Sequence, residues 1–340
     1  MDPVGTDTPC RRPDGRGAGW RRGASASPAR GGDVGNGWRV TQGLVVIVLN
    51  WCGYERTVAC VDSVLASDLP TRVLLVDNAS PDGSGDRLKE RYPSLDVISS
   101  DRNRGYGGGN NLGIRRAREL GAESVVLLNN DVVIEPDCLR LIAKMLCRHP
   151  RAALVAPKIV HADDGTIGAV GGEMRWRLAE ARQIGHLEAD RGQYDEVREV
   201  DFAPGTAVAV RMAAIDEVGV IPEDYFLYLE DVDWSLRFRK RGWKILVEPR
   251  ARVAHRESSS AGKNSPLKGY YYVRNNLLFA DRHAGSCLRT TSRALRGKLV
   301  RMVARELLSG RPSVAEAMIQ GYLDYRAGAT GASPRPLRMK

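Results

Sequence analysis

The sequence has little of what marks a small cross-linked domain or a membrane-spanning protein. Its six cysteines form no Cys-x-x-Cys pair and follow no regular spacing, which argues against a zinc ribbon or a disulfide framework and fits a reducing compartment. No apolar run reaches the ~18 residues of a transmembrane helix. The N-terminus also lacks the continuous apolar core of a secretion signal. These absences predict a cytoplasmic protein.

What is present is an ordinary globular composition. The chain has 340 residues, of which 43% are hydrophobic and 27% charged, so it can bury a sizeable core in one large or two ordinary domains. Residues 1–40 are rich in Arg, Gly, Pro, Ala and Ser and predict a disordered arm. We expect one folded domain over 41–285 and a basic helical tail over 286–340.

The positive charge is concentrated in that tail. It holds 11 Lys/Arg against 3 Asp/Glu, so eight of the ten net positive charges lie there. Its predicted helix interleaves arginines with Leu288, Leu295, Leu299, Met302 and Val303. Such a helix can lie on an anionic membrane surface, or it can pack on the folded domain with its arginines in water. The tail's aromatic residues lie outside this helix, which argues against a nucleic-acid partner.

Strands and helices alternate along the first part of the chain. Short apolar runs predict buried strands at 44–49, 73–76, 95–98 and 125–128. Helical spacing predicts intervening helices, two of them at 54–67 and 105–120. This alternation with short links is typical of an α/β fold with a doubly wound, mostly parallel sheet.

The second part is predicted in less detail. Strands are expected at 153–156, 206–210, 244–247 and 252–254, and helices at 136–148, 212–218, 230–241, 266–279, 288–308 and 313–325. Residues 161–200 are rich in glycine and have weak periodicity. They predict hairpins or a loop that faces a substrate.

Polar side chains follow three of the predicted strands, at Asn50, Asp77 and Asp131. In an open α/β sheet, ligands bind beyond the carboxyl ends of the strands, where such side chains converge. Asp131 closes the strand–turn run Asn129-Asn130-Asp131 and is placed to hold a divalent cation against a phosphate-bearing ligand. A polar turn at the end of the strand explains the run Asn129-Asn130-Asp131 equally well, because Asn and Asp favour turns.

The glycine-rich run at 105–113 is a weak signal for a dinucleotide loop. It follows the third strand and carries no P-loop Lys-Ser/Thr. A Rossmann fingerprint would follow the first strand, where Asn50-Trp51-Cys52-Gly53 stands instead. Small residues in the run still let a backbone approach a nucleotide closely.

Two adjacent acids, Glu230 and Asp231, begin a predicted helix after an aromatic segment. Neighbours on a helix diverge, so one is a candidate general base and the other orients it or makes another contact. Acids at a helix N-terminus also stabilise the dipole by about 0.3–1 kcal/mol, but this does not explain the aromatic residues before them. His255 ends a predicted strand; a lone histidine is more often structural than a ligand.

Taken together, these motifs resemble those of family 2 glycosyltransferases, in particular the rhamnosyltransferase-type branch. The resemblance covers about Leu44 to His283. It is carried by motifs in the family's order: Asn50-Trp51, Asp77-Asn78-x-Ser80-x-Asp82-Gly83, Asn103-x-Gly105-Tyr106-Gly107-x-Gly109-Asn110, Leu128-Asn129-Asn130-Asp131, Phe226-Leu227-Tyr228-x-Glu230-Asp231-x-Asp233 and His255. The resemblance implies a GT-A fold for the 41–285 domain.

The resemblance also implies roles for these residues. Asp77 would contact the nucleobase, and Asp131 would be the main ligand of Mg²⁺ or Mn²⁺ at the family's D-x-D motif, whose first acid is replaced here. Asp231 would be the general base beside Glu230, and His255 would be a second metal ligand. The further donor-binding residues would be Asn50, Asn78, Asn103, Gly105, Asn110, Asn129 and Asn130.

The implied activity is an inverting transfer from a nucleotide-sugar donor. The resemblance favours dTDP-rhamnose, followed by UDP-sugars, with a glycan or lipid-linked acceptor, in polysaccharide or cell-wall biosynthesis. The basic tail would then place the enzyme on the cytoplasmic face of a membrane. The alternative is a non-catalytic nucleotide-sugar-binding homologue or scaffold, against which the presence of Asp131 and the Glu230-Asp231 pair argues.

Overall fold

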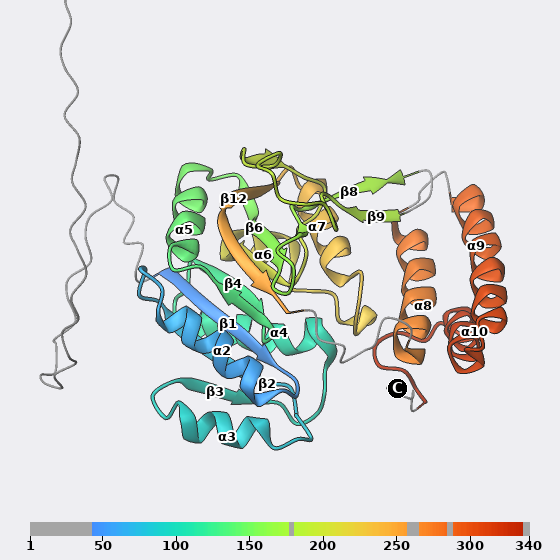
Figure 1. Cartoon of the computed structure of the whole chain (residues 1–340), viewed down its shortest axis with the longest axis horizontal. Coiled ribbons are helices and arrows are strands. Elements are labelled where there is room, and N and C mark those ends of the chain that lie inside the picture. The colour runs from blue at the N-terminus through green and yellow to red at the C-terminus, as the bar shows by residue number, and fades with distance from the viewer. Residues whose placement is uncertain (1–42, 177–179, 257–264, 284–287, 336–340) are drawn as a thin grey trace, which may run out of the picture. The chain divides into compact units, whose positions relative to one another are not determined.

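A computed structural model describes residues 43–176, 180–256, 265–283 and 288–335, without the side-chain surroundings of 288–296. The arm predicted at 1–40 lies outside the described residues. Figure 1 shows a central sheet with helices on both of its faces, and a group of helices from the C-terminal part of the chain.

The central sheet is mostly parallel, as the sequence predicts. Its strand order is β10-β12-β6-β11-β4-β1-β2-β3, with β5 added to β12 and β7 to β6. The strands span Leu44–Asn50 (β1), Arg72–Asp77 (β2), Asp96–Ser99 (β3), Ser124–Asn129 (β4), Val132–Ile134 (β5), Ala152–His161 (β6), Ile167–Ala169 (β7), Arg198–Glu199 (β10), Ala207–Arg211 (β11) and Lys244–His255 (β12). A separate hairpin joins Gly172–Arg175 (β8) to Glu180–Gln183 (β9).

The pairing of the strands brings their ends into line. β4, β1, β2 and β3 run parallel, and Asn50 lies opposite Asp77 while Leu49 lies opposite Asn129. β11 runs antiparallel to both β4 and β6. The expected convergence of Asn50, Asp77 and the residues after β4 at one sheet edge is therefore observed.

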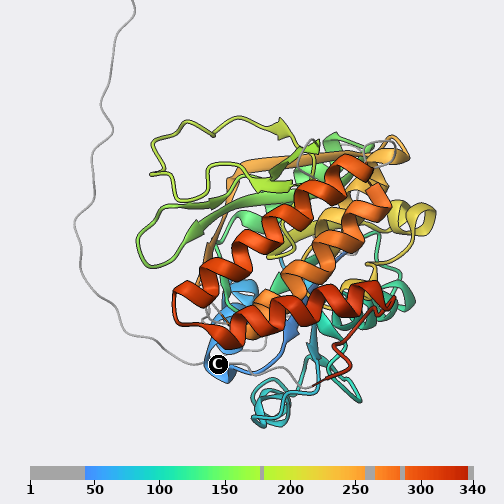
Figure 2. The same ribbon diagram turned by 90° about the vertical axis from the view of Figure 1, so that its right-hand side faces the viewer.

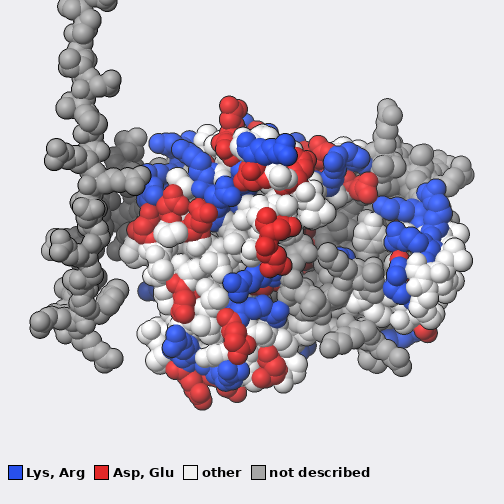
Figure 3. Space-filling model, in the orientation of Figure 1, with Lys and Arg blue, Asp and Glu red and all other residues white. Residues whose placement is uncertain are grey.

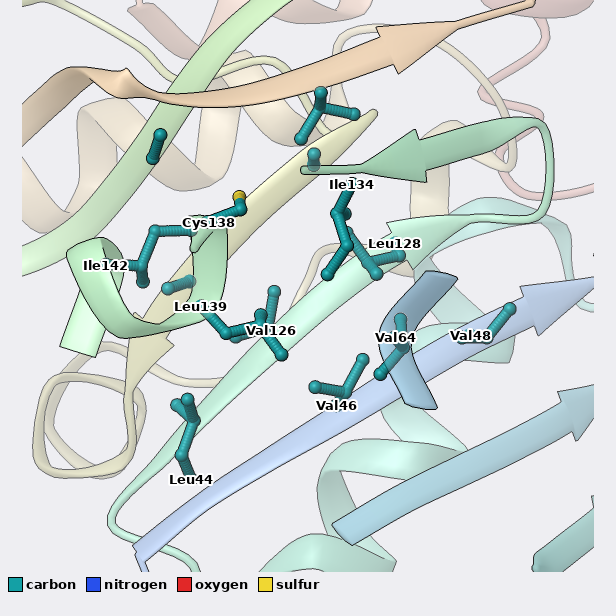
Figure 4. Close-up of a cluster of buried hydrophobic side chains, with 14 of the residues drawn as sticks. Leu44, Val46, Val48, Val64, Val126, Leu128, Ile134, Cys138, Leu139 and Ile142 are labelled. Carbon is teal, nitrogen blue, oxygen red and sulfur yellow. The ribbon is translucent and has the colours of Figure 1, made fainter. Parts of the chain in front are cut away.

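Alternating side chains of the buried strands form two cores, one on each face of the sheet. Leu44, Val46 and Val48 of β1 pack with Val126 and Leu128 against one set of helices, as Figure 4 shows for the side of Cys138 and Ile142. The helices on this face are α2 (Tyr54–Leu65), α3 (Ser84–Arg91) and α5 (Cys138–Arg148). The opposite face is covered by α4 (Gly105–Glu119), α6 (Met212–Val218) and α7 (Glu230–Lys240).

The glycine-rich run lies within the first turns of α4 itself. Glycine allows this helix to pack closely against its surroundings: a Cβ at Gly109 or Gly113 would meet side-chain carbons of Leu49 or Ile47 at 2.6 Å. A Cβ at Gly105 would collide with the carbonyl oxygen of Phe226. The run therefore serves close approach of backbone, and it does so inside a helix.

One prediction about the strands was wrong. The two strands expected at 244–247 and 252–254 are parts of the single strand β12. Its pairing with β6 is interrupted by a register shift between Glu248 and Arg252. Pro249 lies in this interval, and proline has no N–H to donate to a neighbouring strand. The break in the apolar pattern marks a bulge and not the end of a strand.

Three helices of the C-terminal part pack beside one another, as Figure 2 shows. They are α8 (Pro266–His283), α9 (Leu288–Leu308) and α10 (Pro312–Arg326). Leu299, Met302 and Val303 pack against the cluster that α8 and α10 form, so this face of α9 is turned to protein. Within the described residues, no helix is both long and apolar enough to cross a membrane. The domain boundary at 285/286 stays a prediction.

Candidate active site

Asn50, at the end of β1, hydrogen-bonds to the carboxylate of Asp77, at the end of the neighbouring strand β2. Its side chain is fully buried, and its Nδ2 lies 2.7 Å from Asp77 Oδ1 and 3.0 Å from the hydroxyls of Ser80 and Ser84. Asn50 Oδ1 accepts from the hydroxyl of Thr57 at 2.7 Å. Ser80 also donates to Asp77 Oδ1, at 2.5 Å. This network fixes the orientation of the Asp77 carboxylate.

Asn78 links the end of β2 to the start of α4. Its Nδ2 donates to Asn103 Oδ1 and to the carbonyl oxygen of Gly105, each at 3.1 Å, and its Oδ1 accepts from the backbone N–H of Arg104 at 3.0 Å. Asn103 Oδ1 accepts in addition from the N–H of Gly105 at 2.8 Å. The structure therefore brings the predicted donor-binding residues Asn78, Asn103 and Gly105 into direct contact.

Asn110 follows within α4 and is also buried. Its Nδ2 donates to the carbonyl oxygen of Tyr106 at 3.0 Å, whereas its Oδ1 has no hydrogen-bond partner within the described part of the chain. The neighbouring Asn111 has a different task, because its amide exchanges hydrogen bonds with the backbone of Ile221 at 2.9 and 3.1 Å. Asn111 thus fastens α4 to the segment before α7.

Of the run Asn129-Asn130-Asp131, Asn130 is turned toward β1. Its Nδ2 lies 2.8 Å from the carbonyl oxygen of Cys52, 2.9 Å from Thr57 Oγ1 and 3.3 Å from Asn50 Oδ1. Asn130 therefore belongs to the same polar network as Asp77. Its hydrogen bonds tie the turn before Asp131 to the end of β1 and the start of α2.

Asp131 and His255 lie side by side, although they are 124 positions apart in the sequence. β5 pairs with the end of β12, which places His255 opposite Val132, and His255 Nε2 lies 3.3 Å from Asp131 Oδ1. Both side chains are mostly buried, with 11% of Asp131 and 16% of His255 exposed. The backbone N–H of Arg256 donates to the carbonyl oxygen of Asp131 at 2.9 Å and fixes this pairing.

This pair fits one side of a divalent-cation site. Two adjacent ligand atoms of an octahedral ion, at about 2.1 Å from it, lie about 3 Å apart. Carboxylate oxygen and imidazole nitrogen are both accepted by Mn²⁺ and related ions. No group of three or more His, Cys, Asp or Glu side chains with metal-binding geometry occurs among the described residues. Asp131 and His255 are therefore the residues that would hold such an ion.

Glu230 and Asp231 begin α7, as predicted, and their side chains make different contacts. Asp231 Oδ2 accepts from the N–H of Gly205 at 2.9 Å, and its Oδ1 accepts from the N–H of Val232 at 2.8 Å. Glu230 is 4% exposed, and its Oε2 has no hydrogen-bond partner within the part of the chain that the structure describes. Asp231 is therefore oriented by two backbone donors, whereas Glu230 is buried with little polar support.

Burial dominates the electrostatics of this acid pair. Burial raises the pKa of Glu230, and the nearby Asp231 raises it further, to about 8. Burial also raises the pKa of Asp231, against the lowering effect of its hydrogen bonds from Gly205 and Val232. Tyr106 is close enough that its pKa rises well above the usual value, mainly through burial and then through the charges of Asp231 and Glu230. A raised pKa suits a group that accepts a proton near neutral pH.

The acid pair is preceded by a strained backbone segment. Phe226, Tyr228 and Leu229 have φ values of 63°, 71° and 74°, although none of them is glycine. Such conformations cost on the order of 1–3 kcal/mol each and cluster at functional sites. The carbonyl oxygen of Phe226 accepts from the N–H of Tyr106 at 2.8 Å, so this segment touches the start of α4.

A short series of contacts joins the acid pair to the end of β4. The N–H of Asn129 donates to the carbonyl oxygen of Thr206 at 3.0 Å, and the preceding residue, Gly205, donates its N–H to Asp231. The carbonyl oxygen of Gly205 accepts from the hydroxyl of Tyr106 at 2.6 Å. Asp131 and Asp231 therefore stand at the same edge of the sheet, one after β4 and the other beyond the residues that lead into β11.

Sequence reasoning assigned no individual role to Tyr106, Gly205 or Thr206. Tyr106 lies within the glycine-rich motif, and Gly205 precedes a predicted strand. The sequence therefore marks both positions, but it does not indicate which residues they contact. The contact of Gly205 with Asp231 spans 26 residues. No local pattern reports a contact at that separation.

Comparison with known families decides the assignment. The family described as "Glycosyl transferase family 2" matches residues 44–219, which is more than half of the chain. The chain belongs to glycosyl transferase family 2. The match covers the sheet from β1 to β11 and the segments that carry Asp77 and Asp131.

Curated relatives point in the same direction. The chain is 28% identical over 260 residues to "N-acetylglucosaminyl-diphospho-decaprenol L-rhamnosyltransferase" of Mycobacterium tuberculosis (strain ATCC 25618 / H37Rv), which covers 69% of this chain and 83% of the relative. It is 26% identical over 216 residues to "dTDP-rhamnosyl transferase RfbF" of Shigella flexneri, over 61% of this chain and 69% of that protein. This family 2 chain is a rhamnosyltransferase-like glycosyltransferase.

Two solved structures share its fold. Mannosyltransferase PcManGT from Pyrobaculum calidifontis, in complex with GDP-Man and Mn²⁺, aligns with a TM-score of 0.51 at 16% identity, over 86% of this chain and 91% of that one. GalNAc-T7 with UDP, GalNAc and Mn²⁺ aligns with a TM-score of 0.54 at 15% identity, over 80% of this chain. The alignment spans 58% of the GalNAc-T7 chain. The expected GT-A fold is thereby confirmed.

Because the pKa of Glu230 is raised in the folded protein, we expect the free energy of unfolding to decrease as the pH rises. Free glutamate ionises near pH ~4.3, so the contribution of Glu230 to stability is complete below that pH and is lost as the pH rises through about 8. Glu230→Gln keeps the shape without the charge. We expect its free energy of unfolding in urea to exceed that of the wild type by an amount that grows between about pH 5 and pH 8, where each unit of pKa shift corresponds to about 1.4 kcal/mol.

The matched control is Glu316→Gln, at an exposed glutamate of α10. We expect it to leave the pH dependence of unfolding unchanged. A difference between Glu230→Gln and the wild type that is constant across this pH range would contradict the assignment of a raised pKa to Glu230.

Proposed function

We propose that this glycosyltransferase moves a sugar, with inversion, from a nucleoside diphosphate to a hydroxyl of a glycan or lipid-linked glycan. The observation that carries the proposal is the position of Asp231 at the same sheet edge as Asp77 and Asp131, joined to the end of β4 through Gly205 and Thr206. In this arrangement Asp231 would serve the acceptor hydroxyl, and Asp77 and Asp131 would serve the nucleotide-sugar donor. dTDP-rhamnose is the first candidate donor and a UDP-sugar the second, in keeping with the names of the rhamnosyltransferase relatives.

The donor side would be built from the network around Asp77. In this proposal Asp77 contacts the nucleobase, and the buried Asn50 acts by orienting it through their 2.7 Å hydrogen bond. Asn78 and Asn103 hold the start of α4, where Gly105 allows the close approach of the backbone. Further donor contacts are assigned to Asn110, whose Oδ1 is the acceptor without a described partner, and to Asn129 and Asn130.

Asp131 and His255 would hold a divalent cation, Mg²⁺ or Mn²⁺. Their side chains lie 3.3 Å apart and combine a hard oxygen with an imidazole nitrogen. When bound, such an ion supplies Lewis-acid stabilisation of the negative charge on the departing diphosphate. The two related folds in complex with Mn²⁺ support a cation of this kind.

Asp231 would act as the general base. The acceptor oxygen attacks the anomeric carbon from the face opposite the diphosphate, the bond from that carbon to the diphosphate oxygen breaks, and its electron pair leaves with the diphosphate. The acceptor proton passes to Asp231, whose two backbone donors hold the carboxylate in place. Burial and the nearby Asp231 raise the pKa of Glu230, which disfavours two negative charges in the pair at once.

The outer face of α9 supports attachment to an anionic bilayer. Leu307 is 54% exposed and Leu308 is 90% exposed, and the exposed Arg301 and Arg305 lie on the same helix. In Figure 3, Lys and Arg side chains gather over α9 at the right of the view. Apolar side chains among arginines match a surface of anionic lipid headgroups over acyl chains. A lipid-linked acceptor would be presented at such a surface.

The first experiment combines a donor panel with one substitution. We expect metal-dependent release of dTDP from dTDP-rhamnose, in the presence of a polyprenyl-diphospho-N-acetylglucosamine acceptor, to exceed release from UDP-glucose or GDP-mannose. Asp231→Asn should lower kcat by about 10²–10⁴-fold, the usual contribution of a general base. Its affinity for dTDP, measured by calorimetry, should match the wild type.

Asp216→Asn is the control, since it alters an acid on α6 that is 62% exposed and pairs with Arg118. It should keep full activity. Wild-type turnover by Asp231→Asn would remove Asp231 as the base. Release from every donor at one background rate would contradict the transferase proposal for these substrates.

The second experiment tests the cation ligands. Asp131→Asn and His255→Ala should each raise the Mn²⁺ concentration needed for half-maximal activity by about 10–100-fold or more. Electron paramagnetic resonance should detect correspondingly weaker binding of Mn²⁺ in the presence of dTDP. His186→Ala, at an exposed histidine, should change neither quantity. Unaltered Mn²⁺ binding in both site variants would exclude this pair as ligands.

The third experiment tests membrane attachment with the whole chain. We expect the wild type to float with phosphatidylglycerol vesicles and not with pure phosphatidylcholine vesicles. The double substitution Leu307→Ser and Leu308→Ser should reduce flotation at least about tenfold, since each buried leucine contributes about 1.5–3 kcal/mol. Leu65→Ser, on α2, is 53% exposed in the wild type and serves as the control. Equal flotation of the double variant and the wild type would exclude this face.

A further inference from the structure

Two adjacent residues in the middle of α8, Arg274 and Asn275, contact the segment that precedes the acid pair. Both side chains are fully buried. They lie about fifty positions along the chain from the residues that they contact. Neither belongs to the donor, cation or base assignments above.

Asn275 holds three carbonyl oxygens with one amide group. Its Nδ2 lies 3.0 Å from the carbonyl oxygen of Tyr225, 2.7 Å from that of Leu227 and 3.0 Å from that of Tyr228. The two N–H bonds of the amide are thus shared among three acceptors. Three carbonyl groups within four residues thus converge on one amide, in a stretch where Phe226 and Tyr228 have positive φ values.

Arg274 fixes the orientation of that amide. Its Nε donates to Asn275 Oδ1 at 3.0 Å, so the NH₂ group of Asn275 must face the carbonyl oxygens. Its Nη2 donates to the carbonyl oxygen of Tyr225 at 2.7 Å, and its Nη1 to that of Gly331 at 2.6 Å. The guanidinium thereby locks both the amide and the beginning of the strained segment.

The segment that they hold leads directly into the acid pair. Phe226, Tyr228 and Leu229 have positive φ values, and Leu229 is the residue before Glu230. The carbonyl oxygen of Leu229 accepts from the N–H of Asp233 within the first turn of α7, at 2.9 Å. Residues other than glycine favour negative φ. Without the hydrogen bonds from Asn275, we expect Phe226, Tyr228 and Leu229 to return toward negative φ. Relaxation of this segment would therefore shift the start of α7 and, with it, Asp231.

We propose that Asn275 is a positioning residue for sugar transfer, which holds the segment Phe226–Leu229 so that Asp231 keeps its place beside Gly205. The inference rests on the proposed role of Asp231 as the base. Asn275 acts through the backbone, since its amide contacts carbonyl oxygens and neither acid. Arg274 supports it by orienting the amide.

The test is Asn275→Ala in the whole chain, with dTDP-rhamnose, Mn²⁺ and the polyprenyl-linked acceptor. We expect kcat to fall by about 10–100-fold, the effect of misplacing a reacting group by about 1 Å. The KM for dTDP-rhamnose and the affinity for dTDP should stay within about twofold of the wild type. The acid limb of the kcat profile should move to higher pH, because Asp231 loses the N–H of Gly205 that favours its charged form.

The neighbouring asparagine provides a matched control. Asn276 Nδ2 donates to the carbonyl oxygen of Tyr272, within α8 itself, at 2.7 Å. Asn276→Ala removes the same chemical group from the same helix without touching the strained segment. Its kcat, KM and pH profile should equal those of the wild type.

A second substitution covers the case in which Asn275→Ala does not fold. Asn275→Asp has nearly the same size, and its carboxylate would pair with the buried Arg274, but it has no N–H to offer the three carbonyl oxygens. We expect the same loss of kcat and the same shift of the pH profile.

Either folded variant with wild-type kcat and pH profile would overturn the proposal. A loss of activity that follows the folded fraction, measured by circular dichroism, with an unchanged pH profile would also overturn it and leave Asn275 with a structural role alone. Wild-type turnover by Asp231→Asn would instead exclude Asp231 as the general base, whatever the result for Asn275. The two failures are therefore distinguishable.

Discussion

The antiparallel register between β4 and β11 is the constraint on which the site depends. Ala207 lies opposite Leu128, so the residues before β11 return to the end of β4 just where Asn129 donates to Thr206. That return places Gly205 within reach of Asp231. A shift of this pairing by one residue would turn the side chains of β11 to the wrong faces of the sheet and would remove Gly205 from Asp231.

Glycine and asparagine carry out complementary tasks around this edge. Gly105 and Gly205 occupy places where a Cβ would meet the carbonyl of Phe226 or the hydroxyl of Tyr106. The buried asparagines, among them Asn50, Asn78 and Asn111, donate and accept at once and so tie loops and helix starts to the sheet edge. Because a buried amide without partners is costly, each of these networks specifies one arrangement of the loops.

Much of this arrangement could be predicted from the sequence, because it follows from local patterns. Buried apolar runs located the parallel strands, and the carboxyl ends of such strands share an edge, which brought Asn50, Asp77 and Asp131 together. The contacts of Asp231 with Gly205 and of Asn275 with Tyr228 were not predictable, since they join residues 26 and 47 positions apart. The positive φ of Phe226, Tyr228 and Leu229 opposes the preference of their residue types. Likewise, the pattern around Pro249 divided β12 in two, because a bulge and a strand end have the same local signature.

The packing of α8 has a consequence for how such proteins can be recombined. Along this helix, Tyr270 meets α10, where Gly321 lies against its backbone and its hydroxyl donates to Asp324, while Arg274, one turn further on, and Asn275 contact the loop before α7. A chimera that exchanged the C-terminal helices at the α8–α9 connection would separate two halves of one packed unit. Exchange before Pro266 would instead replace α8 as well, and the new helix would need an Arg-Asn pair that fits the loop before α7 of this chain. A helix grafted in place of α8 would therefore have to recognise the backbone of the loop before α7 in this chain.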